Sequence, residues 1–174
     1  MERKPLFKIE KTGLQTTFQD LGRSGYQQYG VPVSGAMDRF SLQMANLLVG
    51  NSRGEAGIEI TMMGPELVAK SGMIVALCGA DLSPAVNGES VLVWKSFRLE
   101  EGDRLTFGTP KSGLRCYLAV SGGFDIPVVM GSKSTYARAK LGTDIKKGDT
   151  VYGFDGDGQP GIGLSRDKIP EYRK

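Results

Sequence analysis

The chain has 174 residues, of which 40% are hydrophobic and 24% charged, and its formal net charge is +3. These values are ordinary for a globular protein, and the small, mixed charge argues against a nucleic-acid-binding surface. The sequence contains no histidine, which excludes Ser-His-Asp and Cys-His catalysis and histidine-ligated zinc or iron. A general acid or base must therefore be a carboxylate, Lys, Tyr or Cys with a shifted pKa, or a substrate group.

Glycine is the unusual component of the composition. The 25 glycines are roughly twice the average share, and they separate short apolar runs. This pattern predicts tight turns between strands. In chain order, apolar alternation predicts a strand or hairpin over 6–18, followed by short strands over 57–64, 66–71 and 73–79.

The clearest helix is predicted over residues 38–48. Its apolar residues recur at helical spacing: Phe40, Met44, Leu47 and Leu48. Ser34 or Asp38 can cap its start, and Gly50-Asn51 ends it.

The second half of the chain is also predicted to form strands and turns. Asn87-Gly88 between apolar runs predicts a hairpin, two strands flank 101–103, and another covers 113–120. Residues 134–142 predict a short helical turn, and the Gly-, Asp- and Pro-rich segment 153–174 predicts a loose tail or linker. We therefore predict a mainly β barrel or sandwich with one main helix and short helical turns.

Two features bear on the cellular compartment. No stretch approaches the ~20 apolar residues of a membrane span, and the N-terminus lacks the apolar region of a signal peptide. Cys78 and Cys116 lie in apolar, strand-like runs without CxxC spacing. We predict a cytoplasmic protein with reduced, buried cysteines, a reactive thiol being the alternative.

Three familiar motifs fail when tested. The stretch "GSKST" is not a phosphate loop, because Ser132 separates Gly131 from Lys133 and the required earlier glycine is absent. No G-x-S-x-G elbow occurs. The run "DGDGQPG" lacks the acidic residue that closes a calcium loop, so no metal site is predicted.

Polar, glycine-containing loops are the remaining candidates for a site. Small residues let a ligand approach the backbone and leave N–H groups free to bind an oxyanion. The candidate substrate-binding residues in these loops are Ser34, Gly35, Gly79, Ala80, Ser121, Gly122, Gly131, Ser132 and Ser134. We expect them to gather at one mouth of the sheet.

Three carboxylates beside these loops are candidate catalytic groups. Asp81 and Asp20 can act as a base or accept a substrate amide, and each can instead close a turn. Asp38 is a third candidate, with a helix-start role as its alternative. Arg23 can bind an anion or pair with Asp20 through solvent, and Lys133 is a second cation for a carboxylate or phosphate.

These loops carry a family resemblance in their order along the chain. The stretches are "TTFQDLGRSGYQQYGVPVSGAMD", "GIEITMMGPEL", "CGADLSPAVNG" and "RCYLAVSGGFDIPVVMGSKSTYARAKLG". Over residues 9–152 the chain resembles the biotin-dependent carboxyltransferase family, which includes allophanate hydrolase subunit 2 and the C-type subunit of 5-oxoprolinase (KipA).

The resemblance implies a fold and three possible functions. The fold is a cyclophilin-like closed β-barrel. One implied function is ATP-dependent hydrolysis of 5-oxoproline to glutamate together with the A-type and B-type subunits of 5-oxoprolinase. The alternatives are a KipA-type regulator that antagonises KipI, the inhibitor of a sporulation histidine kinase, and a carboxyltransferase that moves a carboxyl group between biotin and urea.

The resemblance also sets expectations for organisation and cofactors. Family members are about twice as long, which implies that residues 1–152 are an N-terminal barrel domain and that 153–174 leads to a second half of the chain. This half alone is expected to be inactive. ATP is expected to act through the complex, and biotin, if used, arrives on another protein because this sequence has no Met-Lys-Met attachment motif.

Overall fold

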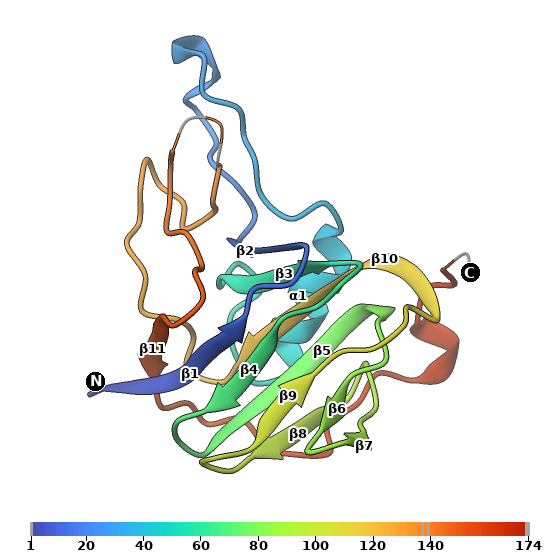
Figure 1. Cartoon of the computed structure of the whole chain (residues 1–174). Coiled ribbons are helices and arrows are strands. Elements are labelled where there is room, and N and C mark those ends of the chain that lie inside the picture. The colour runs from blue at the N-terminus through green and yellow to red at the C-terminus, as the bar shows by residue number, and fades with distance from the viewer. Residues whose placement is uncertain (1, 137, 139, 173–174) are drawn as a thin grey trace.

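The computed structural model describes residues 2–136, 138 and 140–172 and contains two antiparallel sheets with one α-helix (Figure 1). The first sheet contains, in spatial order, β11 (Thr150–Phe154), β1 (Arg3–Lys11), β4 (Glu66–Ala69), β9 (Arg104–Thr106), β6 (Ala85–Val86) and β7 (Glu89–Ser90). The second contains β2 (Gln15–Gln19), β3 (Gly57–Thr61), β10 (Ser112–Val120), β5 (Met73–Asp81) and β8 (Ser96–Leu99). Helix α1 spans Arg39–Leu48, and two short 3-10 helices cover Gln27–Tyr29 and Arg166–Lys168.

The predicted mainly β architecture with one main helix is confirmed. Within the described ranges, strand pairing gives two separate sheets and no pairing closes them into one barrel. The closed barrel therefore stays a prediction.

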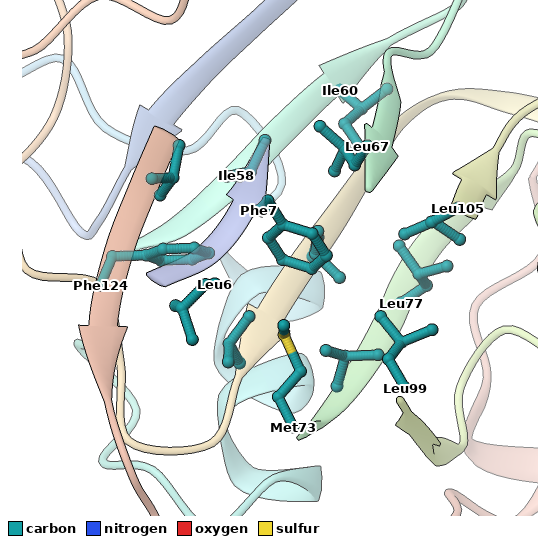
Figure 2. Close-up of a cluster of buried hydrophobic side chains, with 14 of the residues drawn as sticks. Leu6, Phe7, Ile58, Ile60, Leu67, Met73, Leu77, Leu99, Leu105 and Phe124 are labelled. Atoms are coloured by element: carbon teal, nitrogen blue, oxygen red, sulfur yellow. The ribbon is translucent and has the colours of Figure 1, made fainter. Parts of the chain in front are cut away.

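The main hydrophobic core lies between the two sheets. Successive side chains of a strand point to opposite faces, so Ile58 and Ile60 of β3 enter the core while Glu59 and Thr61 point outward. Both sheets contribute to the cluster in Figure 2, where the labelled side chains are Leu6, Phe7, Ile58, Ile60, Leu67, Met73, Leu77, Leu99, Leu105 and Phe124. Fully burying one such side chain stabilises the fold by about 1.5–3 kcal/mol.

Helix α1 covers the outer face of the second sheet over β10 and β5. Its buried residues are Ser41, Leu42, Ala45, Asn46 and Leu48, so the predicted helix is confirmed but its predicted apolar stripe is partly wrong. Phe40 and Leu47 are exposed. Asn46 is buried because its side-chain nitrogen donates to the carbonyls of Arg53 (3.3 Å) and Glu55 (2.7 Å), which fixes the chain after the helix.

The predicted turn at Asn87-Gly88 and the two strands predicted around 101–103 are confirmed, whereas residues 6–18 contribute to two strands that do not form a hairpin. Asn87 (φ 52°) and Gly88 (φ 84°) form the tight turn of the β6–β7 hairpin, which requires positive φ at both positions. The hairpin allowed over 6–18 does not form, because β1 joins the first sheet and β2 joins the second. The two strands around 101–103 likewise divide between the sheets, with β8 beside β5 and β9 beside β4.

Two long loops extend from the molecule on the same side, beyond β2 (Figure 1). We call residues 20–38 the first loop and residues 121–149 the second loop; they are light blue and orange in the figure. The amide of Thr135 in the second loop donates to the carbonyl of Phe18 on β2 (2.9 Å). The predicted helical turn over 134–142 includes residues 137 and 139, which lie outside the described residues.

The segment after β11 is packed against the second sheet. The amide of Gly161 donates to the carbonyl of Ser96 (2.8 Å), and the amide of Leu164 donates to the carbonyl of Trp94 (3.1 Å). Leu164, Ile169 and Tyr172 pack against the cluster beneath α1. The described part of 153–174 is therefore ordered by contacts, and its link to a second half of the chain stays a prediction.

Helix α1 has ten residues, and no helix in the described part of the chain is long and apolar enough to cross a membrane.

Candidate functional site

The Asp20 carboxylate joins the first loop to the second loop. Oδ1 accepts hydrogen bonds from the amide of Gly22 (2.8 Å), the hydroxyl of Ser132 (2.6 Å) and the hydroxyl of Ser134 (2.8 Å). Oδ2 accepts from the amide of Lys133 (2.8 Å). The predicted residues Asp20, Ser132 and Ser134 are thus brought together across more than a hundred positions of sequence.

These contacts determine the ionisation of Asp20. Burial by itself raises the pKa of this carboxyl, but the bonds from Ser132, Lys133, Gly22 and Ser134 outweigh it and lower the pKa below its ordinary value. The group is therefore ionised at neutral pH, and both of its oxygens accept hydrogen bonds within the chain. This geometry suits an anchor between loops better than a proton-accepting base, and a catalytic role for Asp20 stays a prediction.

Arg23 lies fully buried in the first loop. Its Nε donates to the carbonyl of Val129 in the second loop (2.9 Å), whereas its two terminal nitrogens have no hydrogen-bond partner in the part of the chain described. No carboxylate of the described residues forms an ion pair with it. Asp20 therefore makes no direct ion pair with Arg23, and pairing of the two through solvent stays a prediction. A buried cation without a counter-ion is costly, so the arrangement favours an anionic or strongly accepting ligand.

Three further predicted residues lie in the same two loops. Ser34 (φ 56°) and Gly35 (φ 92°) form a turn with left-handed backbone. A Cβ at Gly35 would lie 2.8 Å from the amide nitrogen of Gly22, so this close approach of the backbone requires glycine. Gly131 lies in the turn before Ser132, near the Tyr26 ring.

Lys133 is held by partners within the chain. Its Nζ donates to Glu55 Oε1 (3.0 Å) and to the carbonyl of Phe124 (3.1 Å). Two of the three donors of its ammonium group are therefore used, and its role as a second cation for a substrate carboxylate or phosphate stays a prediction.

Asp38 caps helix α1. Its Oδ1 accepts from the amide of Ser41 (3.1 Å), and its Oδ2 accepts from the hydroxyls of Ser41 (2.5 Å) and Tyr172 (2.8 Å). The backbone amide of Asp38 donates to the hydroxyl of Tyr117 (2.9 Å). This capping role explains Asp38 without catalysis, although the residue borders a pocket of about 340 Å³ with Arg115.

Asp81, Gly79 and Ala80 lie at the end of β5. Asp81 Oδ1 accepts from the amide of Ser83 (2.9 Å), which is the Asx-turn alternative. Gly79 is paired with Cys116 on β10, and Ala80 is buried in the core. Asp81 also borders a pocket of about 180 Å³ that includes Lys111.

Ser121 and Gly122 lie at the other end of the same strand pair. The Ser121 hydroxyl accepts from the amide of Gly158 (2.8 Å), and the Gly122 amide donates to Asn51 Oδ1 (3.0 Å). Asp81 faces Ser112 at the start of β10, whereas Ser121 follows its end. The expectation of one shared mouth is therefore wrong, because antiparallel pairing places these two residues at opposite ends of the strands.

The cysteines behave as predicted structural residues. Cys78 and Cys116 are buried and reduced, and burial strongly raises the pKa of both thiols. Cys116 belongs to the core between the sheets, whereas Cys78 belongs to the cluster under α1. Within the described ranges there is also no cluster of three potential metal-ligating side chains.

Sequence reasoning missed the polar side chains of β3. Glu59 and Thr61 alternate with two isoleucines in "GIEIT" and lie buried on the outer face of the sheet. Glu59 Oε2 accepts from the hydroxyl of Tyr117 (2.7 Å) and from the amide of Met37 (3.0 Å). The sequence did indicate these contacts, because Glu59 lies between two isoleucines and a charged residue within an apolar strand requires a polar partner.

The described residues form a mainly β domain with two packed antiparallel sheets and one covering helix. Its polar site lies at two loops joined by the half-buried Asp20 carboxylate. The family model "Carboxyltransferase domain, subdomain A and B" matches residues 29–161. The chain belongs to this family, as the resemblance in its loop sequences implied.

Curated relatives and solved structures agree with this assignment. The chain is 40% identical over 139 residues to the C-type subunit of 5-oxoprolinase from Escherichia coli (strain K12), covering 79% of this chain and 44% of that protein. It is 36% identical over 151 residues to urea amidolyase of Lachancea kluyveri, covering 84% of this chain and 8% of that protein. The chain thus spans less than half the length of these relatives.

Two crystal structures share the fold. The structure of TTHA0988 superposes with a TM-score of 0.89 at 32% identity, covering 95% of this chain and 34% of that one. The urea carboxylase of Kluyveromyces lactis superposes with a TM-score of 0.80 at 33% identity, covering 99% of this chain and 16% of that one.

Proposed function

We propose that this chain forms the N-terminal domain of a 5-oxoprolinase C-type protein, within a complex that hydrolyses 5-oxoproline to glutamate with ATP. The 40% identity to the corresponding 5-oxoprolinase protein of Escherichia coli supports this assignment. The observation that carries it is the buried Arg23 guanidinium, whose terminal nitrogens lack partners within the described residues. 5-Oxoproline carries a carboxylate that a guanidinium binds well, whereas urea is neutral.

In this proposal the two loops bind and orient the substrate. Arg23 donates to the substrate carboxylate, and Asp20 holds the second loop in place through Ser132 and Ser134. Backbone amides of the glycine turns are proposed to stabilise the developing oxyanion when water attacks the lactam carbonyl. The lactam C–N bond then breaks, and its nitrogen takes a proton to become the amine of glutamate.

ATP handling is assigned to the other subunits of the complex. The stretch 131–135 does not have the spacing of a phosphate loop, and the lysine within it is bound to Glu55. The catalytic contribution of Asp81 also remains a proposal, because it lies away from the loop junction at the end of β5.

The test is an ATP-dependent 5-oxoproline assay with A- and B-type subunits, using this chain and a version extended past residue 174. Arg23→Met in the active form is expected to raise the KM for 5-oxoproline by roughly 10- to 100-fold, because hydrogen bonds to a charged group are each worth about 1.5–3 kcal/mol. Arg53→Met is the matched control, because Arg53 is exposed and makes no side-chain ion pair within the described ranges. Unchanged turnover in Arg23→Met would remove Arg23 from the mechanism, and the same assay with Asp81→Ala tests that residue.

A urea carboxyltransferase is the second candidate, because the chain is 36% identical to urea amidolyase of Lachancea kluyveri. A dependence of activity on a biotinylated partner, with urea as acceptor, would favour this function over lactam hydrolysis. A KipI-like partner is tested separately by whether the chain captures a B-type subunit without any gain in ATP hydrolysis.

A further inference from the structure

An exposed apolar surface lies where β3 ends beside the start of β10. Its members expose between 42% and 70% of their surface, and they are Leu14, Met37, Met62, Met63 and Leu114. They are five of the eleven large hydrophobic side chains that are exposed among the described residues. We call these five residues the methionine patch.

Contacts join the methionine patch into one surface. The amide of Leu14 donates to the carbonyl of Met63 (2.9 Å), and the amide of Met62 donates to the carbonyl of Leu114 (2.8 Å). Leu114 and Met37 border the same pocket of about 340 Å³. Four separate segments of the chain thus bring apolar side chains together at the surface, and contiguous exposed apolar surface marks a site of interaction with another molecule.

Met62 is a poor residue for its position if the fold alone is considered. It lies in the turn after β3 with a φ of 55°, in the left-handed region that glycine and asparagine adopt more readily. Its surface is 42% exposed, so burial contributes little to its stability there. An apolar side chain at an exposed, left-handed position indicates a contact outside this chain.

Arg115 adds a charge at the border of the methionine patch, since it lines the pocket with Met37 and Leu114. Its one ion pair within the described ranges joins Nε to Glu59 Oε1 at 3.9 Å, which is beyond hydrogen-bond distance. Glu59 Oε2 instead accepts from the Tyr117 hydroxyl and the Met37 amide. About a third of the Arg115 side chain is exposed (32%), so its guanidinium is free to bind a carboxylate from another molecule.

The composition of this surface favours a protein partner over a membrane or a second copy of the chain. Methionine and arginine are enriched in the cores of protein interfaces, and flexible methionine side chains adapt to the shape of a partner. A membrane-binding surface requires several cations, whereas this one has a single arginine beside Glu59. A two-fold dimer would pair the surface with itself, and its carboxylates, Glu59 and Asp38, already accept hydrogen bonds within the chain.

We propose that the methionine patch and Arg115 dock a partner subunit, which presents a carboxylate to Arg115 and apolar side chains around it. The inference rests on the proposed function, because the A-type and B-type subunits of that complex are the expected partners. The surface contains none of the residues proposed to bind the substrate, so docking is measured by binding, without turnover.

The first measurement follows the methionine methyl signals of the isotope-labelled chain by NMR while a purified A-type or B-type subunit is added. The signals of Met37, Met62 and Met63 are expected to shift with one of the two subunits, and the buried Met73 is the internal reference. Vesicles of anionic phospholipid are a separate arm. A version of the chain extended past residue 174 is another, and it tests whether a second half of the chain covers the surface.

The second measurement compares the affinities of two variants and their matched controls for that subunit by isothermal titration. Arg115→Met is expected to raise the Kd about 30-fold relative to Arg53→Met, because arginine is among the residues that dominate interface energies and Arg53 is exposed outside the patch. Met62→Asn is expected to raise the Kd about fivefold relative to Leu92→Asn, which changes an exposed leucine outside the patch. Met62→Asn should also keep or raise the Tm, because asparagine tolerates a positive φ better than methionine.

Four results would overturn the proposal. They are no shift of the patch signals with either subunit, equal affinity of both variants and their controls, shifts with vesicles in place of a subunit, and patch signals in the extended chain that no subunit moves. The failure of the proposed function is distinguishable from these. If the complex does not hydrolyse 5-oxoproline but a subunit binds the wild type more tightly than Arg115→Met, the docking surface stands and the assigned reaction falls.

Discussion

Removing the Asp20 carboxylate is the most direct test of how the two loops are held together. Asp20→Ala takes away the acceptor of four hydrogen bonds, from Gly22, Ser132, Lys133 and Ser134. A hydrogen bond to a charged group contributes about 1.5–3 kcal/mol, and water replaces part of that at a half-buried site. We therefore expect the free energy of unfolding to fall by about 3 kcal/mol, which is two such bonds.

The magnitude converts to a measurable shift. In a chain of this size, each kcal/mol lowers the Tm by roughly 2–4 °C, so Asp20→Ala is expected to lose about 6–12 °C. Asp20→Asn keeps an oxygen for the three donors at Oδ1 and places a donor against the Lys133 amide. It is expected to lose about half as much, because one contact is lost and the others no longer involve a charge.

The assay is thermal and urea unfolding at neutral pH, with hydrogen exchange at the Lys133 amide as a local readout. Asp157→Ala is the control, because Asp157 is exposed and such substitutions usually stay within about 0.5 kcal/mol. If Asp20→Ala matched Asp157→Ala, or if the Lys133 amide exchanged no faster in Asp20→Ala than in the wild type, the anchoring role of the carboxylate would be refuted.

Three further predictions follow from the same structure. The pKa of Asp20 in the folded chain lies below its ordinary value of 3.8. Ionised Asp20 therefore stabilises the fold above pH 3.8, and this stabilisation is lost as the pH falls through the folded-state pKa. Acid unfolding below about pH 4, followed by circular dichroism, should depend less steeply on pH in Asp20→Asn than in the wild type. Gly35→Ala should cost about 1–3 kcal/mol in urea unfolding and more than Gly30→Ala, because both positions have positive φ but only Gly35 lies against neighbouring backbone. Both buried cysteines should resist a thiol reagent in the native state and react fully in denaturant, and fast native labelling would contradict their raised pKa and burial.

The candidate site shows why only part of a site is readable from one sequence. Arg23 was a candidate because it lies in a polar, glycine-rich loop, and its orphaned guanidinium strengthens that hypothesis. Lys133 also lies in a polar, glycine-containing loop, yet its ammonium group donates to Glu55 and to the Phe124 carbonyl. The difference lies in partners far along the chain, which local patterns do not specify.

The outer face of β3 gives the opposite case, in which the sequence contained a signal that the prediction did not use. Strand alternation puts Glu59 and Thr61 on the side opposite Ile58 and Ile60. Only the register with β2 and β10 brings Gln19 and Arg115 to the same face. Because a shift of one residue would turn every side chain over, the set cannot be assembled before the register is known.

The sequence by itself determined the features that depend on near neighbours. Asp38 and the apolar spacing after it predicted helix α1 and its N-terminal cap, and Asn87-Gly88 predicted the β6–β7 hairpin. Both features depend on backbone preferences and hydrogen bonds within a few residues. Tertiary structure alone decided that adjacent strands such as β8 and β9 enter different sheets, and that Asp20 meets Ser132 and Ser134 while Asp81 and Ser121 lie at opposite strand ends. Those outcomes depend on pairing and core packing between distant segments, which a local pattern permits in several ways and only the folded chain selects.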